Sequence, residues 1–168
     1  KVRQAKEVRA LRQAHRIYPK LAIILTIKHP AIDVYVRMKK AYGADILIDV
    51  DVYKVEQATV PALIKQLNSD ESVHGIILQL PLEDPLQTET LVNLITPSKD
   101  IDGLGVNTLF DPATAMAILW LLAGYNIDLA DKSVLLVGRG KLVGAPLERV
   151  LKSTGVNVEV AEKEVSDL

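Results

Sequence analysis

The stretch that decides the fold of this chain is residues 73–105, which read VHGIILQLPLEDPLQTETLVNLITPSKDIDGLG. A short apolar run at residues 75–80 is closed by Pro81, and such a run predicts a buried strand. Gln79 then lies near the carboxyl end of that strand, where open α/β sheets place their ligand sites. A helix is expected over residues 88–95, and a polar loop with two carboxylates follows it. The stretch therefore predicts one strand–helix–loop unit that carries an amide and fixed negative charge.

The segments before residue 73 alternate between helix and strand. The expected elements, in chain order, are a helix over 2–16, a strand over 21–27, a helix over 30–42, a strand over 45–52 and a helix over 59–67. Pro30 is placed to open the second helix and Gly43 to end it, while Thr59 can cap the third. This rhythm predicts a parallel sheet with helices on both faces.

The regular alternation of helices and strands changes after residue 105. The expected elements are a long apolar helix over 112–125, a strand over 133–137, a glycine-rich turn, a helix from about 145 and a last strand over 157–161. We place a domain boundary near residues 106–112. The fold class is therefore α/β with two parallel-sheet domains, an N-terminal α/β substrate domain and a C-terminal Rossmann-like dinucleotide-binding domain. Two strands and one helix leave the second sheet incomplete.

Composition excludes several kinds of partner. The formal net charge is −1 and no basic block occurs, so nucleic acid is not expected as a partner. The chain has no cysteine, and its three histidines lack metal-ligand spacing, so neither thiolate chemistry nor a metal is expected. No apolar run reaches the roughly 20 residues of a membrane span, so no membrane partner is expected.

Tyr35 and Lys39 form the first candidate pair. They are four apart on an expected helix and so share a face. A phenol beside an amine can bind a planar ring and move a proton. The simpler interpretation of this pair alone is a solvated helix. Short-chain dehydrogenases also use Tyr-x-x-x-Lys, but they place it after the glycine-rich turn, whereas here it comes long before one.

Two further candidates lie in the deciding stretch. The amide of Gln79, which Leu80 and Pro81 follow, could hold the Lys39 amine in one orientation, although Gln before Pro is often only a turn former. Either Asp100 or Asp102 could accept hydrogen bonds from a ligand heterocycle, although a solvated loop or a helix cap is the alternative. Their neighbours Gly103 and Gly105 favour a ligand, because glycine allows close backbone approach.

The last candidate is the turn Gly138-x-Gly140-x-x-x-Gly144 between a strand and a helix. Backbone N–H groups and a helix N-terminus there can bind a pyrophosphate. The spacing is one residue longer than the common G-x-G-x-x-G, and a tight strand–helix turn is the alternative. Arg139 and Lys141 add positive charge beside the expected phosphates.

Taken together, these motifs resemble one family, the bifunctional methylenetetrahydrofolate dehydrogenase/methenyltetrahydrofolate cyclohydrolases. The matching segments, in the family's order, are residues 30–31, 34–39, 75–82, 97 with 99–103, and 137–139 with 143, 144 and 146. The resemblance implies a folate-binding catalytic domain over 1–108, then a crossover helix and a partial Rossmann NAD(P)-binding domain over 109–168. It implies oxidation of 5,10-methylenetetrahydrofolate to the methenyl form, then hydrolysis to 10-formyltetrahydrofolate.

The resemblance also implies roles for single residues. Tyr35 would pack on the folate ring, and Lys39, oriented by Gln79, would serve the cyclohydrolase step. Pro81 would join the substrate-binding residues, and Asp102 would bind the pterin. Tetrahydrofolate derivatives would be the substrates of a cytoplasmic homodimer.

The cofactor is a choice between NADP and NAD. The predicted cofactor-binding residues are Gly138, Arg139, Gly140, Lys141, Gly144, Glu162 and Lys163. Glu162 lies 24 residues after Gly138, near the spacing of the acid that binds the ribose 2′-OH of NAD. Against it, Arg139 and Lys163 could accommodate the 2′-phosphate of NADP, and the family habit favours NADP.

Three departures from the family pattern are visible. Ile32 stands where the family usually has Ser, Ala113-Thr114-Ala115 where it has Cys-Thr-Pro, and Gly140 where it often has Ser. Two alternatives therefore stay open. One is a catalytically impaired member that binds a ligand or a partner, and the other is a different two-domain NAD(P) dehydrogenase, such as an amino-acid dehydrogenase.

Overall fold

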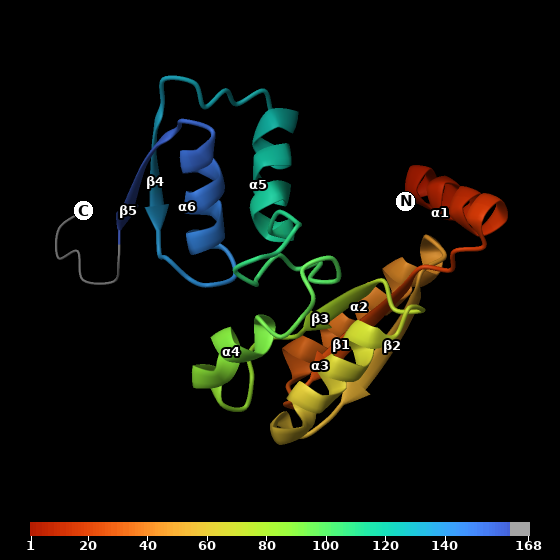
Figure 1. Ribbon diagram of the computed structural model, residues 1–168. Coiled ribbons are helices and arrows are strands. Elements are labelled where there is room, and N and C mark those ends of the chain that lie inside the picture. The colour runs from red at the N-terminus through yellow and green to blue at the C-terminus, as the bar shows by residue number, and fades with distance from the viewer. Residues whose placement is uncertain (162–168) are drawn as a thin grey trace. The chain divides into compact units, whose positions relative to one another are not determined.

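The computed structural model describes residues 1–161 (Figure 1). The described chain divides into two compact units. The first contains Lys1–Ile101 and Gly105–Leu109, and the second contains Asp102–Leu104 and the chain from Phe110 onward. Each unit is a parallel sheet with helices, so the predicted α/β class with two parallel sheets is confirmed.

The first unit carries the alternating helices and strands. Its elements are α1 (Val2–His15), β1 (Lys20–Leu25), α2 (Pro30–Asp45), β2 (Asp49–Lys54), η1 (Gln57–Thr59), α3 (Val60–Ser69), β3 (Gly75–Leu78), η2 (Pro85–Gln87) and α4 (Thr88–Val92). The strands pair in the order β2-β1-β3, and both pairings are parallel. All three carboxyl ends therefore meet at one edge of the sheet, the edge at which ligands bind in open α/β folds.

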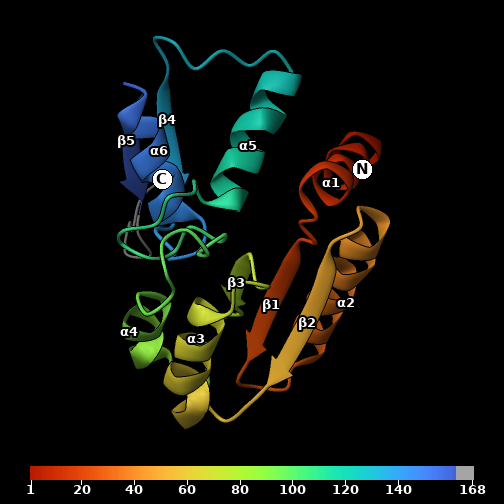
Figure 2. The same ribbon diagram turned by 45° about the vertical axis from the view of Figure 1, so that its right-hand side comes forward.

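Both faces of this sheet are covered. Ile23 and Leu25 of β1 and Ile77 of β3 pack with Ile32 and Val36 of α2 in one buried cluster. Side chains alternate along a strand, so the residues between these point to the opposite face. In Figure 2, α3 covers that opposite face. The helices fall on opposite faces because right-handed crossovers lead from β1 to β2 in one direction and from β2 to β3 in the other.

The expected end of the second helix at Gly43 is wrong. α2 continues to Asp45, and β2 begins at Asp49 rather than at residue 45. A Cβ built on Gly43 would lie 2.6 Å from the Val50 side chain and 2.9 Å from the Ile48 carbonyl oxygen. The glycine thus lets α2 pack closely against the chain that follows it. From the sequence alone, a glycine with this packing role cannot be distinguished from one that ends the helix.

Two other expectations about helix ends are also wrong. Thr59 makes no side-chain cap for α3; its hydroxyl donates instead to the Glu56 carbonyl (2.8 Å). α4 ends at Val92 rather than at residue 95, and the backbone then tightens into turns in which the Leu94 and Ile95 N–H groups donate to carbonyls three residues back.

The end expected for the strand in residues 73–105 is also wrong. This strand, β3, stops at Leu78, two residues before the expected end.

The second unit contains α5 (Ala113–Gly124), β4 (Ser133–Val137), α6 (Gly144–Ser153) and β5 (Asn157–Ala161). Both strands have the predicted bounds and pair in parallel. Ala115 of α5 and Leu147 and Leu151 of α6 form its buried core with partly buried side chains of both strands. Among residues 1–161, no helix combines the length and the apolar character that crossing a membrane requires.

Candidate functional site

The side chains of Lys39 and Gln79 meet, as predicted. Lys39 Nζ donates to Gln79 Oε1 at 2.8 Å, across 40 residues of sequence. Gln79 follows β3 directly, and its backbone N–H donates to the Ile24 carbonyl of β1 (3.0 Å). The parallel pairing thus continues one residue past the strand and fixes the backbone that carries the amide. Both side chains are half-buried, so the pair is ordered yet within reach of a ligand.

The orientation of the Gln79 amide is determined by a second contact. Its Nε2 donates to the carbonyl of Leu80 (3.1 Å), which leaves the amide oxygen for Lys39. The Leu80–Pro81 peptide is cis. A neutral amide orients an ammonium without adding the negative charge by which a carboxylate would favour the protonated amine. This arrangement suits a lysine that takes part in proton transfer.

Gln57 supports this segment and was missed by the sequence analysis. Its buried side chain donates to the carbonyl of Asp84 (3.1 Å) and accepts from the Asp84 N–H (2.9 Å). The two bonds hold the chain that leaves Pro81 against η1. No pattern in the sequence pointed to Gln57, because a single glutamine between two strands reads as an exposed loop residue.

Tyr35 lies one turn before Lys39 on α2, as predicted, and is 59% exposed. A tyrosine ring this open to solvent on the lysine's side of the helix is available to stack on a planar ligand. Ile32, on the same helix, is 4% exposed and belongs to the core cluster.

The polar loop after α4 is held together by two of its charged groups. The Lys99 ammonium donates to the carbonyls of Leu67, Asn68 and Asp70 at 2.9, 2.9 and 2.8 Å, and so closes the C-terminal end of α3. Asp100 is buried, and its Oδ2 accepts the Gly105 N–H at 2.8 Å. Both groups therefore have structural roles in this loop. The half-buried Asp102 stays the carboxylate predicted to bind a ligand.

The glycines of this loop serve the chain's own packing. Gly103 has φ of +67°, and a Cβ on it would lie 2.7 Å from the Phe110 carbonyl oxygen. A Cβ on Gly105 would lie 3.0 Å from Asp100 Oδ2. The interpretation that both glycines make room for a ligand is therefore wrong, because the molecule's own atoms occupy that space.

The glycine-rich turn lies at the carboxyl end of β4, where α6 begins. Gly138 has φ of +94° and donates to the Ala161 carbonyl (2.9 Å), and Gly144 could not carry a Cβ without colliding with the Gly138 carbonyl oxygen. A cavity of about 430 Å³ opens here, and its lining includes Gly138, Gly140, Lys141 and Gly144. The helix N-terminus, the glycines of the turn and a lysine together suit a phosphate group.

Arg139 does not line this cavity. Its Nε donates to Glu148 Oε2 of α6 at 2.7 Å, and Lys152 Nζ donates to the other oxygen, Oε1, also at 2.7 Å. The Glu148 side chain is 7% exposed. The hydrogen bond from Lys152, with help from Arg139 and against the cost of burial, holds the pKa of Glu148 below its usual value. We name Arg139, Glu148 and Lys152 the α6 charge triad.

Glu148 was missed by the sequence analysis, although Glu148 and Lys152 are four apart on a helix, a spacing typical of ion pairs. Two predicted residues, Glu162 and Lys163, lie outside the described part of the chain.

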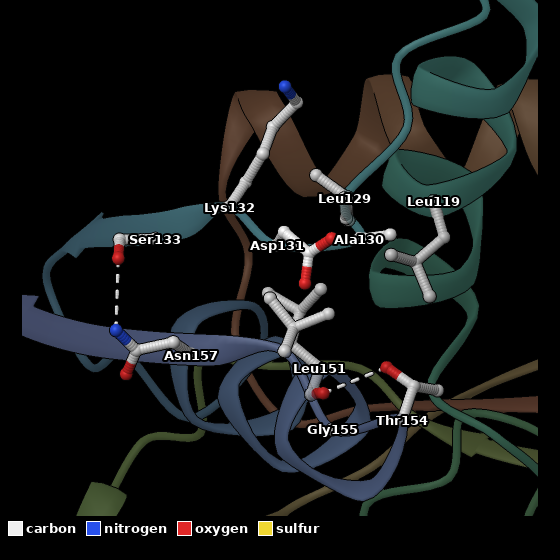
Figure 3. A pocket seen from close by; sticks show the side chains of 11 residues that line it. Leu119, Leu129, Ala130, Asp131, Lys132, Ser133, Leu151, Thr154, Gly155 and Asn157 are labelled. Atoms are coloured by element: carbon white, nitrogen blue, oxygen red, sulfur yellow. Dashed lines mark hydrogen bonds between the residues drawn. The ribbon is translucent and has the colours of Figure 1, made fainter.

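A larger cavity, of about 600 Å³, lies in the second unit near the amino ends of β4 and β5 (Figure 3). Its polar groups include Asn157, which donates to Ser133 Oγ (2.9 Å), and Thr154, which donates to the Leu151 carbonyl (2.8 Å). None of the predicted site residues within the described part of the chain lines it. Within residues 1–161, no group of three or more histidines and carboxylates could hold a metal ion.

Comparison with known families gives two matches that together cover most of the chain. Residues 1–102 match the tetrahydrofolate dehydrogenase/cyclohydrolase catalytic domain, and residues 112–168 match the NAD(P)-binding domain of the same proteins.

Individual relatives agree with these matches. The bifunctional protein FolD of Bradyrhizobium diazoefficiens is 34% identical over all of this chain and 62% of its own length. The crystal structure of the Campylobacter jejuni bifunctional enzyme FolD is 32% identical, with a TM-score of 0.87 over 99% of this chain and 65% of that one. The Trypanosoma brucei FolD, complexed with NADP cofactor and inhibitor, is 25% identical, with a TM-score of 0.89 over 98% of this chain and 61% of that one. The chain therefore spans about three fifths of the length of such relatives.

Proposed function

The chain belongs to the tetrahydrofolate dehydrogenase/cyclohydrolase family, and on that premise we propose that it oxidises 5,10-methylenetetrahydrofolate and hydrolyses the methenyl product to 10-formyltetrahydrofolate. The observation that carries the proposal is the 2.8 Å hydrogen bond between Lys39 and Gln79 at the carboxyl edge of the first sheet. In this proposal residues 1–108 form the folate-binding catalytic domain and residues 109–168 the crossover helix and the NAD(P)-binding part.

Lys39 and its neighbours have distinct tasks in the proposed reaction. The open ring of Tyr35 stacks on the folate, and Asp102 accepts hydrogen bonds from the pterin. Pro81 adds an apolar contact beside Gln79. Water attacks the cationic methenyl carbon and forms the new C–O bond. As the C–N5 bond then breaks, Lys39, held by the Gln79 amide, assists the proton transfers.

A nicotinamide cofactor fits the turn at α6. When bound, it supplies the acceptor for the hydride that leaves the methylene carbon. The cavity beside Gly138, Gly140 and Gly144 offers backbone N–H groups and a helix N-terminus to the pyrophosphate, and Lys141 adds a positive charge.

NADP is the cofactor that we propose, in preference to NAD. Arg139 stands at the turn as a second cation, and a guanidinium can bind the 2′-phosphate with two parallel hydrogen bonds. Lys163 would join it, whereas Glu162 would favour the ribose 2′-OH of NAD. The NADP bound to the Trypanosoma brucei relative supports the same choice. We extend the proposal to a cytoplasmic homodimer, as the family resemblance implies, and light scattering of the purified chain tests the dimer.

A spectrophotometric assay tests the activity. The purified chain is given 5,10-methylenetetrahydrofolate with NADP or NAD, and methenyltetrahydrofolate formation is followed by its absorbance. We expect turnover with a higher kcat/KM for NADP, and a tenfold preference for NAD would contradict the cofactor choice. A folded chain that shifts the absorbance of a folate analogue but forms no product would instead favour the impaired, ligand-binding alternative.

A further inference from the structure

The α6 charge triad contains a carboxylate that the proposed reaction does not use. Glu148 is buried within the second unit, and each of its oxygens accepts a 2.7 Å hydrogen bond, one from Arg139 and one from Lys152. Lys152 lies four residues further along the same helix and therefore fixes the carboxylate relative to α6. A carboxylate with both oxygens engaged and its charge matched is poorly suited to move protons. Its position next to the turn points to another use.

The contact between Glu148 and Arg139 engages only one nitrogen of the guanidinium. The bond runs from Nε, the nitrogen nearest the backbone, and the Arg139 side chain is still 55% exposed. The outer edge of a guanidinium carries the two terminal nitrogens, and this edge matches a phosphate with two parallel hydrogen bonds. A partner at Nε therefore holds the plane of the group while leaving that edge for a ligand.

Holding the guanidinium lowers the cost of binding. An arginine in solvent samples many rotamers, and ordering the side chain opposes binding. In dinucleotide folds a nearby arginine accommodates the 2′-phosphate of NADP. We propose that Glu148 is a positioning residue that fixes the Arg139 guanidinium beside the glycine-rich turn and thereby determines the preference for a 2′-phosphate over a 2′-hydroxyl. This inference rests on the proposed dinucleotide site.

A second account of the same contact makes the opposite prediction. If Glu148 acted only through its charge, it would repel a phosphate dianion, and removing the charge would strengthen 2′-phosphate binding. Two variants separate position from charge. Glu148→Asp keeps the charge but withdraws the carboxylate by one methylene, whereas Glu148→Gln keeps an oxygen acceptor at nearly the same place without the charge.

The experiment is calorimetric titration of the whole chain with adenosine 2′,5′-bisphosphate and with adenosine 5′-monophosphate. The Kd for the monophosphate divided by the Kd for the bisphosphate isolates the contribution of the 2′-phosphate, and a larger ratio means a stronger preference for the bisphosphate. We expect the wild type to prefer the bisphosphate, and Glu148→Asp to reduce that preference at least fivefold with little change in Kd for the monophosphate. Glu159→Asp, the same change at an exposed carboxylate of β5, is the matched control and should keep the wild-type ratio.

A readout without ligand accompanies the titration. The Arg139 Nε–H signal in ¹⁵N NMR should be protected from exchange in the wild type and lose protection in Glu148→Asp, while thermal unfolding shows that both proteins are folded. A wild-type Kd ratio in Glu148→Asp would overturn the inference, as would a ratio that rises in Glu148→Gln alone. A wild type that binds both nucleotides equally would overturn it too, but would leave the dinucleotide site intact. A wild type that binds neither would instead contradict the proposed function.

Discussion

Replacing Lys99 with methionine should destabilise the first unit without touching a ligand-binding group. The ammonium reaches across from the loop after α4 and donates to three carbonyls at the C-terminal end of α3, Leu67, Asn68 and Asp70. Such carbonyls have no partner within the helix, and a cation there also complements the helix dipole. Methionine keeps most of the length and the apolar stem but removes every donor.

The magnitude follows from the three hydrogen bonds. One bond to a charged group contributes about 1.5–3 kcal/mol, but three bonds that share one ammonium do not add, and water can reach part of this site. We therefore expect Lys99→Met to lower the free energy of unfolding by about 3 kcal/mol. For a chain of this size that corresponds to a fall in Tm of about 6–12 °C.

Urea unfolding followed by circular dichroism measures the effect. Lys65→Met, on the exposed side of the same helix, is the matched control and should change stability by less than about 0.5 kcal/mol. A loss below about 0.5 kcal/mol for Lys99→Met, with weakened binding of a folate analogue, would refute the structural role of Lys99 and place its ammonium in the ligand site.

Three further predictions concern other parts of the chain. Gly144→Ala should destabilise the second unit by about 2 kcal/mol in urea unfolding, because the added Cβ collides with the Gly138 carbonyl, whereas Gly140→Ala, with no atom within 4 Å of its Cβ, should be nearly neutral. Ile32→Ser, which restores the usual family residue, should cost about 3 kcal/mol because it leaves a hole and a hydroxyl in the core; a neutral result would contradict the packing. The depressed pKa of Glu148 implies stability that is present above about pH 4.3 and is lost as pH falls through its folded-state pKa. The difference in unfolding free energy between the wild type and Glu148→Gln should therefore shrink between pH 6 and pH 3, and a constant difference would argue against the ion pairs.

The parts of the fold that followed from the sequence are those set by local patterns. Apolar runs predicted each strand among residues 1–161, although β2 begins four residues later than expected. The pattern is clearest for β3, because a strand buried on both faces needs a continuous apolar stretch. The contact between Lys39 and Gln79 was also predicted, because α2 begins at the carboxyl edge of the parallel sheet, the edge at which β3 ends.

What the sequence could not predict depends on contacts between distant segments. Gly43 resembles a helix terminus, and only the approach of Val50 shows that it serves packing. Asp100 and Asp102 are carboxylates of the same short loop, and only the burial of Asp100 and the Gly105 N–H that it accepts show that Asp100 has a structural role. The sequence predicted Arg139 as a phosphate-binding residue, but nothing in the local pattern showed that its Nε would donate to Glu148.

The most direct test of the account is the rate at which Lys39→Met hydrolyses methenyltetrahydrofolate, added as substrate without nicotinamide and followed by its absorbance. Positioned proton transfer contributes about 10²–10⁴ to a rate, so we predict a loss of at least about 100-fold in the variant. Lys40→Met, at the exposed neighbouring position on α2, should keep the wild-type rate. A well-folded Lys39→Met protein that hydrolyses the substrate as fast as the wild type would contradict the assignment of the Lys39–Gln79 pair as the catalytic site.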